Sequence, residues 1–320
     1  MRRLVKIIAI IAGLLLIAFL IFRTPDTDPA DMRTKYGGAP SQFIEIGGGT
    51  TVHLRDEGPR DALPIILLHG SNADLHTWQP WAEVLREDYR VIRFDQVGHG
   101  LTGADPGEDY SVANYVEDID EVADALGLER FVLGGNSMGG GHTLAYALEH
   151  PDRLIGIVLV DAGGAPVRRE GGGNLAFTLA AMPGIGNVMS QLLPRSLVER
   201  SLSQSVSNQA VVTPEAVDRY WEMARYPGNR AATRARFARG LSSFSAEEIA
   251  SLDMPALVMW GAEDALIPLE AGKWLDARLP NSTLVTYQGI GHLPQEEAPA
   301  RSIADLRSWL MSLPLANQSP

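Results

Sequence analysis

Short apolar runs alternate with longer amphipathic stretches along most of this chain. Apolar runs lie at 64–68, 131–135 and 155–160, and a similar run at 90–94 includes two arginines. Helical patterns at 78–87, 112–126 and 139–150 separate these runs. Continuous apolar runs are typical of strands that are buried on both faces. Apolar residues three and four apart are typical of helices. The alternation predicts an α/β fold with a mainly parallel sheet and helices on both faces.

The pattern changes on either side of this central region. Segments 43–46 and 51–55 flank Gly47-Gly48-Gly49, which predicts a hairpin. From about 163 to 251 the sequence contains no convincing strand, only short helical pieces rich in methionine and aromatic residues. Two further strands follow at 256–260 and 283–288, and then a closing helix at 301–313. We therefore expect one domain over 41–313, a helical lid inserted at about 163–251, and a frayed tail at 314–320.

The first residues form the longest apolar stretch of the chain. No side chain from 7 to 22 is charged or strongly polar, and Lys6 stands near the end, where its amine can reach the membrane interface. Counted from Leu4, a helix here spans about 28 Å, close to the hydrocarbon thickness of a bilayer. We expect residues 1–23 to be an uncleaved membrane anchor. A cleaved signal peptide is the alternative, but the residues after Phe22 make a poor cleavage site.

The charges around this stretch predict its orientation. Arg2, Arg3 and Lys6 precede it, whereas Arg23 is followed by several aspartates. The positive-inside rule then places the N-terminus in the cytoplasm and the main body outside the cytoplasmic membrane, on the periplasmic side. Residues 24–40, rich in Pro, Asp, Thr and Gly, are expected to form a mostly extended linker.

Composition narrows the class of protein. The chain has 320 residues, 45% of them hydrophobic and 21% charged, which is the globular range. It has no cysteine, which excludes disulfides, thiolate metal sites and a cysteine nucleophile. The net charge of −12 argues against nucleic acid as a partner. Nothing in the sequence predicts the oligomeric state.

The most informative motif is Gly135-Asn136-Ser137-Met138-Gly139. It lies between an apolar run and a helical pattern, the context expected of a serine nucleophile on a tight strand-to-helix turn. Glycines two residues away on each side remove the Cβ atoms that would collide in such a turn. The amides at the start of the helix also favour negative charge at the same point.

This motif resembles the nucleophile elbow of the α/β-hydrolases, and the resemblance extends over residues 41–313. Four other segments share it: Leu67-Leu68-His69-Gly70, Phe94-Asp95 with Gly98-His99-Gly100, Gly261-Ala262-Glu263-Asp264, and Gly289-Ile290-Gly291-His292. The similarity is to esterase- and lipase-like serine hydrolases, with some similarity to meta-cleavage-product C–C hydrolases. It implies an eight-stranded, mainly parallel sheet with a helical lid.

The resemblance also implies a Ser-Asp-His triad. A serine hydroxyl needs a base to take its proton, and the base needs a carboxylate to orient it. In this family the chain order is serine, acid, histidine, which Ser137, Asp264 and His292 fit. Asp161, directly after a predicted strand, is the alternative acid, because some relatives place the acid there.

The family's oxyanion hole uses two backbone N–H groups. One belongs to the residue after the nucleophile, here Met138. The other lies in the loop after His69-Gly70, for which we choose Ser71, with Asn72 as the second choice.

The remaining histidines carry weaker signals. His99 and Asp95 resemble a turn that is structural in this family, and His142 is expected to be packed on the helix after the elbow. His53, His76 and His150 show no partner pattern. No histidine–carboxylate spacing indicates a metal, and we predict neither a metal nor a cofactor.

The function that follows is hydrolysis of a carboxylic ester of a small to medium hydrophobic substrate through an acyl-enzyme. The serine excludes those relatives that need an aspartate nucleophile. A C–C bond hydrolase of meta-cleavage type is the nearest alternative, although the loop after His69-Gly70 differs from the loop usual in those enzymes. A non-catalytic, membrane-anchored binding protein is the alternative from a different class.

Overall fold

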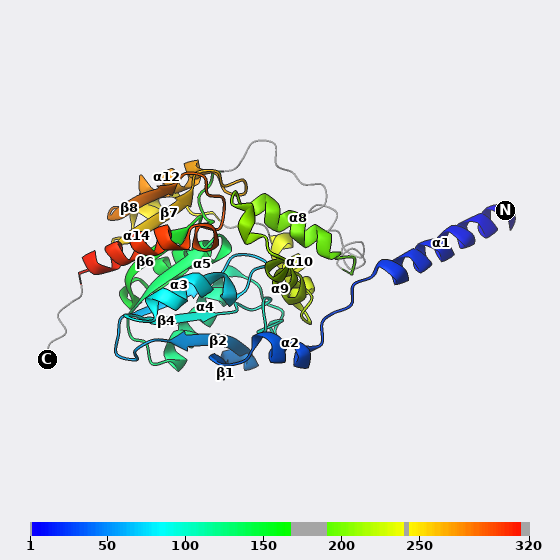
Figure 1. The fold of residues 1–320 in the computed structure, drawn as a ribbon, viewed down its shortest axis with the longest axis horizontal. Coiled ribbons are helices and arrows are strands. Elements are labelled where there is room, and N and C mark those ends of the chain that lie inside the picture. Colours follow the sequence, from blue (N-terminus) through cyan, green and yellow to red (C-terminus); the bar gives the residue numbers. More distant parts are fainter. Residues whose placement is uncertain (1, 168–190, 240–242, 315–320) are drawn as a thin grey trace.

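The computed structural model describes residues 2–167, 191–239 and 243–314 (Figure 1). Its centre is an eight-stranded sheet in the order β1-β2-β4-β3-β5-β6-β7-β8. The strands are β1 (Ser41–Glu45), β2 (Thr51–Glu57), β3 (Pro64–Leu68), β4 (Arg90–Phe94), β5 (Phe131–Asn136), β6 (Leu154–Val160), β7 (Ala256–Gly261) and β8 (Ser282–Tyr287). Strands β3 to β8 pair with one another in parallel. Strand β2 pairs antiparallel with β1 and with β4. The predicted eight-stranded, mainly parallel α/β fold is therefore confirmed.

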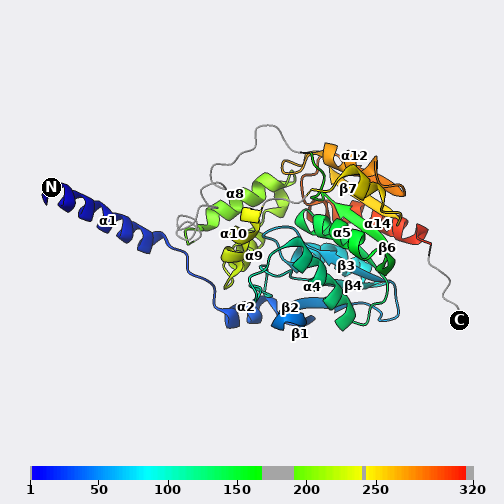
Figure 2. The ribbon, with the colours of Figure 1, turned by 180° about the vertical axis from the view of Figure 1, so that it is seen from behind.

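Each face of the sheet carries its own hydrophobic core. In β3, Ile66 and Leu68 belong to one core and Ile65 and Leu67 to the other, as the two-residue period of a strand requires. The first core includes apolar residues of α4 (Val112–Ala125), α5 (Met138–Glu149) and α12 (Leu269–Asp276). The second includes those of α3 (Gln79–Leu85) and α14 (Pro299–Ser312). Helices thus cover both faces of the sheet (Figures 1 and 2).

A helical insert separates β6 from β7. In its described part it contains α8 (Arg195–Ser205), η4 (Gln209–Val211), α9 (Pro214–Ala224), α10 (Asn229–Arg239) and α11 (Ala246–Ala250), and no strand. Residues 168–190 and 240–242 of the predicted lid lie outside the described residues, as do 315–320 of the predicted tail. Helices α8 to α10 lie together on the side of the body from which the N-terminal segment emerges (Figure 2).

The N-terminal helix α1 (Arg2–Phe22) extends away from the body (Figure 1). Its segment Val5–Phe22 has a mean hydropathy of 3.0 and is not buried against the body, so it is long and apolar enough to cross a membrane. A signal sequence near the N-terminus would have the same properties.

The prediction of a mostly extended linker at 24–40 is wrong in one part. Helix α2 (Pro29–Tyr36) lies within it, because the Asp28 side chain caps the first turn and proline suits the first helical positions. The only buried residue of α2, Met32, packs against Leu101, Met223 and Tyr226. The amide of Thr24 also donates to Gln191 O at 2.7 Å. The segment is therefore attached to the helical insert.

Candidate active site

Ser137 occupies the turn between β5 and α5 in a strained conformation. Its φ of 54° and ψ of −116° lie where residues other than glycine are uncommon. A Cβ on Gly135 would lie 2.6 Å from the Gly140 N, and a Cβ on Gly139 would lie 2.7 Å from the His69 O. Glycine at both positions is what allows the turn. Ser137 itself is half-buried, in contrast to the fully enclosed strand before it.

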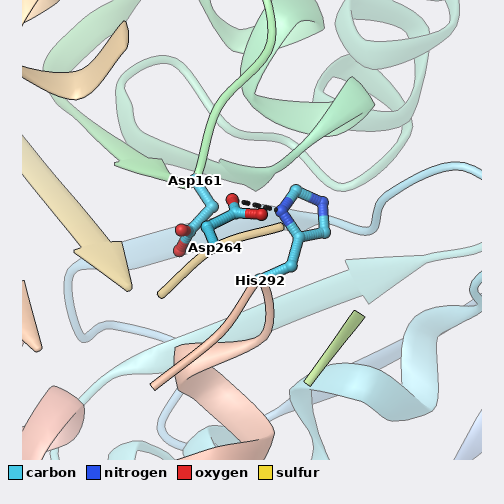
Figure 3. Close-up of side chains that lie close together, drawn as sticks. All are labelled: Asp161, Asp264 and His292. Carbon is cyan, nitrogen blue, oxygen red and sulfur yellow. Dashed lines mark hydrogen bonds and ion pairs between the residues drawn. The ribbon is translucent and has the colours of Figure 1, made fainter. Parts of the chain in front are cut away.

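Asp264 and His292 meet after the ends of two neighbouring strands. Asp264 follows β7, His292 follows β8, and His292 Nδ1 bonds Asp264 Oδ2 at 2.6 Å (Figure 3). The other carboxylate oxygen, Oδ1, accepts hydrogen bonds from the backbone amides of Leu266 at 2.7 Å and Ile267 at 3.0 Å. Burial alone would raise the pKa of Asp264, but the charge and hydrogen bond of His292 and these amides hold it below its ordinary value. The pair is therefore built around an ionised carboxylate.

Asp161, the alternative acid, lies beside Asp264 but does not bond to the histidine. It follows β6 with a φ of 43°, and its Oδ1 accepts the amide of Gly261 at 3.0 Å. Its Oδ2 is buried without a hydrogen-bond partner among the described residues. Burial, followed by the charge of Asp264, raises the pKa of Asp161 well above its ordinary value. Of the two neighbouring carboxyl groups, Asp161 is therefore the one whose pKa is raised.

Asp161, Asp264 and His292 also offer ligand atoms that all lie within 4.8 Å of one another, a spacing that suits a metal ion. Both oxygens of Asp264 are already engaged, one with His292 and the other with two amides. The sequence prediction of no metal stays a prediction.

The elbow is joined to the histidine loop through Asn136. Its Nδ2 donates to Val160 O and to His292 O, each at 3.1 Å. The amide of His292 in turn donates to Ser205 O of α8 at 2.8 Å. Among the described residues, no hydrogen bond joins the Ser137 hydroxyl directly to His292. The structure therefore brings Ser137 and His292 onto adjoining loops at one edge of the sheet.

The predicted oxyanion-hole residues lie on the loop after β3 and at the start of α5. A Cβ on Gly70 would lie 3.1 Å from Ser137 Cβ, so this loop adjoins the nucleophile elbow. His69 Nδ1 bonds Gly70 O at 2.8 Å, and its Nε2 accepts the Gln96 amide at 3.0 Å, which fixes the loop. Met138 is the first residue of α5, where amides have no acceptor within the helix. The loops that carry Ser71 and Met138 thus both flank Ser137.

Two histidines without a predicted partner have one in the structure. His53 Nδ1 bonds Asp95 Oδ2 at 2.7 Å and its Nε2 bonds Ser41 Oγ at 2.8 Å, while His76 Nδ1 bonds Asp74 Oδ1 at 2.7 Å. The first set has the atom order of a serine triad. However, His53 is fully buried, and Asp95 also accepts the amides of Leu75 and Leu101. We regard it as a structural network between β1, β2 and the loop after β4.

The other histidines differ in burial. His99 and His142 are buried, and His142 stacks on Tyr115 with ring centroids 4.2 Å apart. Burial, with a smaller effect from the charge of Arg236, lowers the pKa of His142 to about 3. His150 lies 4.0 Å from Glu149 and is more exposed than either.

Arg236 is a residue at this site that the sequence did not single out. It is buried on α10, and its Nη1 lies 2.9 Å from Ser71 Oγ and 2.9 Å from Met138 Sδ. The sequence of α10 is rich in arginine and offers no signal that would select this one. Arg236 lies on the face of α10 that packs against the body, which only the structure shows.

A separate pocket of about 480 Å³ lies between α2, α3 and the insert. Tyr36, His76, Arg219 and Glu296 are among its lining residues, and the predicted triad is not.

Comparison with known proteins identifies the family. The family model described as the alpha/beta hydrolase fold matches residues 64–299. A 2-hydroxy-6-oxo-2,4-heptadienoate hydrolase of Pseudomonas putida is 31% identical, over 79% of this chain and 90% of its own. A thermophilic esterase from Thermogutta terrifontis is 27% identical with a TM-score of 0.72, over 84% of this chain and 98% of its own. A membrane phospholipase A shares the fold over 97% of this chain and 98% of its own, at 22% identity and a TM-score of 0.71. This chain therefore belongs to the α/β-hydrolase fold family.

Proposed function

We propose that this hydrolase cleaves a carboxylic ester of a small to medium hydrophobic substrate through an acyl-enzyme on Ser137. The observation that carries the proposal is the 2.6 Å bond between His292 and Asp264, next to a serine held at a glycine-flanked elbow. His292 Nε2 takes the proton of the Ser137 hydroxyl and returns it to the leaving alcohol. Asp264 fixes the tautomer of His292 and stabilises the imidazolium.

The amides of Ser71 and Met138 stabilise the oxyanion of the tetrahedral intermediate in this scheme. One such donor contributes about 2.7–4 kcal/mol to catalysis. Water then attacks the acyl-enzyme by the same route. The scheme needs a contact between Ser137 Oγ and His292 Nε2, and hydrogen bonds of this kind often tighten only in the complex with substrate.

A second candidate is hydrolysis of a C–C bond of meta-cleavage type. The hydrolase of Pseudomonas putida that is 31% identical supports it. The same Ser137 and His292 would serve, so the two functions differ in substrate rather than in machinery. Residues 71–74, which follow His69-Gly70, favour ester hydrolysis because they differ from the loop usual in C–C hydrolases. The proposed membrane anchor favours it too, because an anchor is unusual for an enzyme that degrades soluble aromatic compounds.

A substrate panel separates the candidates. The full chain in detergent is assayed with 4-nitrophenyl esters of increasing acyl length and with vinylogous 1,5-diketones. We expect turnover of the esters by wild type and none by Ser137→Ala. Turnover of the diketones alone would favour the second candidate. No turnover of either class, together with no labelling by a fluorophosphonate, would favour a non-catalytic binding protein.

We also propose that residues 1–23 anchor the protein in the cytoplasmic membrane, with the domain at 41–313 on the periplasmic side and the insert at about 163–251 acting as a lid. The exposed apolar surface of α1 supports an anchor, and the basic residues before it support the orientation. Resistance to alkaline carbonate extraction and activity of a C-terminal alkaline phosphatase fusion would be expected. Release by carbonate, or an inactive fusion, would contradict this part of the proposal.

A further inference from the structure

Arg236 is a buried cation next to the candidate active site. Only 9% of the residue is exposed, and it reaches from α10 to the two segments that flank Ser137. Its Nη1 contacts Ser71 Oγ and Met138 Sδ, and its Nη2 donates to Thr233 Oγ1 at 3.2 Å. All three of these partners are neutral groups.

Each other arginine that is buried in the described part of the chain has a carboxylate partner. Arg93 pairs with Glu57 at 2.6 Å, Arg90 pairs with Asp56 at 2.9 Å, and Arg230 pairs with Asp26. Among the described residues, no carboxylate lies within ion-pair distance of Arg236, and its Nε is buried without an acceptor. A buried charge without a counterion is costly, so a function for Arg236 has to offset that cost.

The surroundings of Arg236 do not supply a negative charge either. Burial, followed by the charge of Arg236, lowers the pKa of His99 well below its ordinary value and that of His142 to about 3. The unsatisfied Nε donor of Arg236 and the neutral partners of its Nη atoms, beside the loops around Ser137, indicate a place for a ligand group with acceptor oxygens.

We propose that Arg236 binds an anionic group of the substrate, so that the preferred ester carries a carboxylate or a phosphate in addition to its hydrophobic part. This inference rests on the proposed ester hydrolysis. Arg236 would then be a specificity residue, because the planar guanidinium binds carboxylate and phosphate oxygens well. Two sources of the anion are possible, the acyl chain and the alcohol.

The test compares matched pairs of anionic and neutral esters on the full chain in detergent. One pair is 4-nitrophenyl hemiglutarate and 4-nitrophenyl valerate, which places a carboxylate on the acyl side. The other is 1-butyrylglycerol 3-phosphate and 1-butyrylglycerol, which places a phosphate on the alcohol side. For one of the anionic esters, we expect Arg236→Gln to lower kcat/KM by about 10- to 100-fold, with little change for its neutral partner.

Two further variants keep the result interpretable. Arg236→Lys retains a charge and should recover part of the selectivity even if Arg236→Gln folds poorly. Arg239→Gln on the same helix is the matched control, because Arg239 is exposed and pairs with Asp109 at 3.3 Å. Equal losses on charged and neutral esters, or no loss on either anionic ester, would overturn the proposal.

A binding measurement separates this inference from the proposed function. Titration calorimetry of Ser137→Ala with glutarate and with glycerol 3-phosphate should show binding of one anion, and Arg236→Gln in the same background should remove it. If wild type hydrolyses no ester but this binding is found, the proposed function fails and the anion site stands. If neither anion binds Ser137→Ala, the anion site is wrong.

Discussion

Asp161 and Asp264 lie side by side after neighbouring strands, yet only Asp264 bonds to His292 (Figure 3). The two carboxyl groups differ in the direction of their pKa shifts as well as in position. The pKa of Asp264 lies below its ordinary value and that of Asp161 well above it. The neighbouring strands β6 and β7 thus present two acids with opposite pKa shifts to the same region.

This difference predicts unequal effects of two matched substitutions. Asp264→Asn should lower kcat for 4-nitrophenyl butyrate by about 10⁴-fold, because the amide favours the wrong tautomer of His292. Asp161→Asn should change kcat little, because Asp161 does not bond to His292 and its raised pKa favours the uncharged form that asparagine resembles. Steady-state kinetics of both purified variants checks this. A severe loss in Asp161→Asn with a harmless Asp264→Asn would assign the acid to Asp161 instead.

The glycine-flanked elbow predicts a strong steric effect at one position. Gly139→Ala places a methyl group 2.7 Å from His69 O, where backbone has to move, and should destabilise the fold by about 1–3 kcal/mol or more. Gly38→Ala is the control, since a Cβ there meets nothing within 4 Å. Thermal unfolding followed by circular dichroism measures both. Equal stability of the two variants would mean that the elbow can accommodate a methyl group at position 139, which would contradict the close contact with His69 O.

Asp118 predicts a pH dependence of stability. It is buried on α4, its Oδ2 has no hydrogen-bond partner among the described residues, and burial followed by the charge of Asp105 raises its pKa to about 7. When the pKa of an acid is higher in the folded state than in the unfolded state, ionisation of that acid destabilises the folded state. This loss of folding free energy is absent below the unfolded-state pKa near 4 and grows as the pH rises to about 7.

Asp118→Asn should therefore stabilise the protein at pH 8, by at most about 4 kcal/mol, and not at pH 4. Urea unfolding at the two pH values measures the difference. Asp152→Asn, at an exposed position, is the control and should show no such dependence. Stabilisation of the same size at both pH values would contradict the explanation.

The contacts of α2 predict where the chain can be shortened. Removal of residues 1–23 should leave the unfolding midpoint of the body unchanged, because α1 does not pack on it. Removal of residues 1–40 should lower the midpoint, because it deletes buried Met32 and the bonds of Lys35 and Tyr36 to Glu222. Differential scanning calorimetry of the two shortened proteins compares them. A lower midpoint already in the first one would show that the anchor supports the fold.

Much of the fold could be predicted because the central strands are buried on both faces. Segment 64–68 then reads as a continuous apolar run and matches β3 in full. Segment 90–94 matches β4 in full, although Arg90 and Arg93 interrupt its apolar residues. The elbow could be predicted for a related reason, since its glycines have a steric cause that depends only on neighbouring residues. Local causes are visible in a sequence.

Features that depend on distant partners could not be predicted in this way. The bond between His53 and Asp95 requires β2 and β4 to pair antiparallel, and the buried position of Arg236 requires α10 to pack over the loop after β3. Helix α2 is different, since Asp28 and Pro29 are recognisable start signals. A composition typical of linkers masks these signals in segment 24–40.

The central claim is that Ser137 is the nucleophile, and covalent labelling tests it most directly. The full chain is incubated with a fluorophosphonate, digested and analysed by mass spectrometry, with Ser137→Ala and His292→Ala as controls. We expect one adduct on the peptide that contains Ser137, absent in Ser137→Ala and much slower to form in His292→Ala. An adduct on another serine, or none on folded wild-type protein, would contradict it.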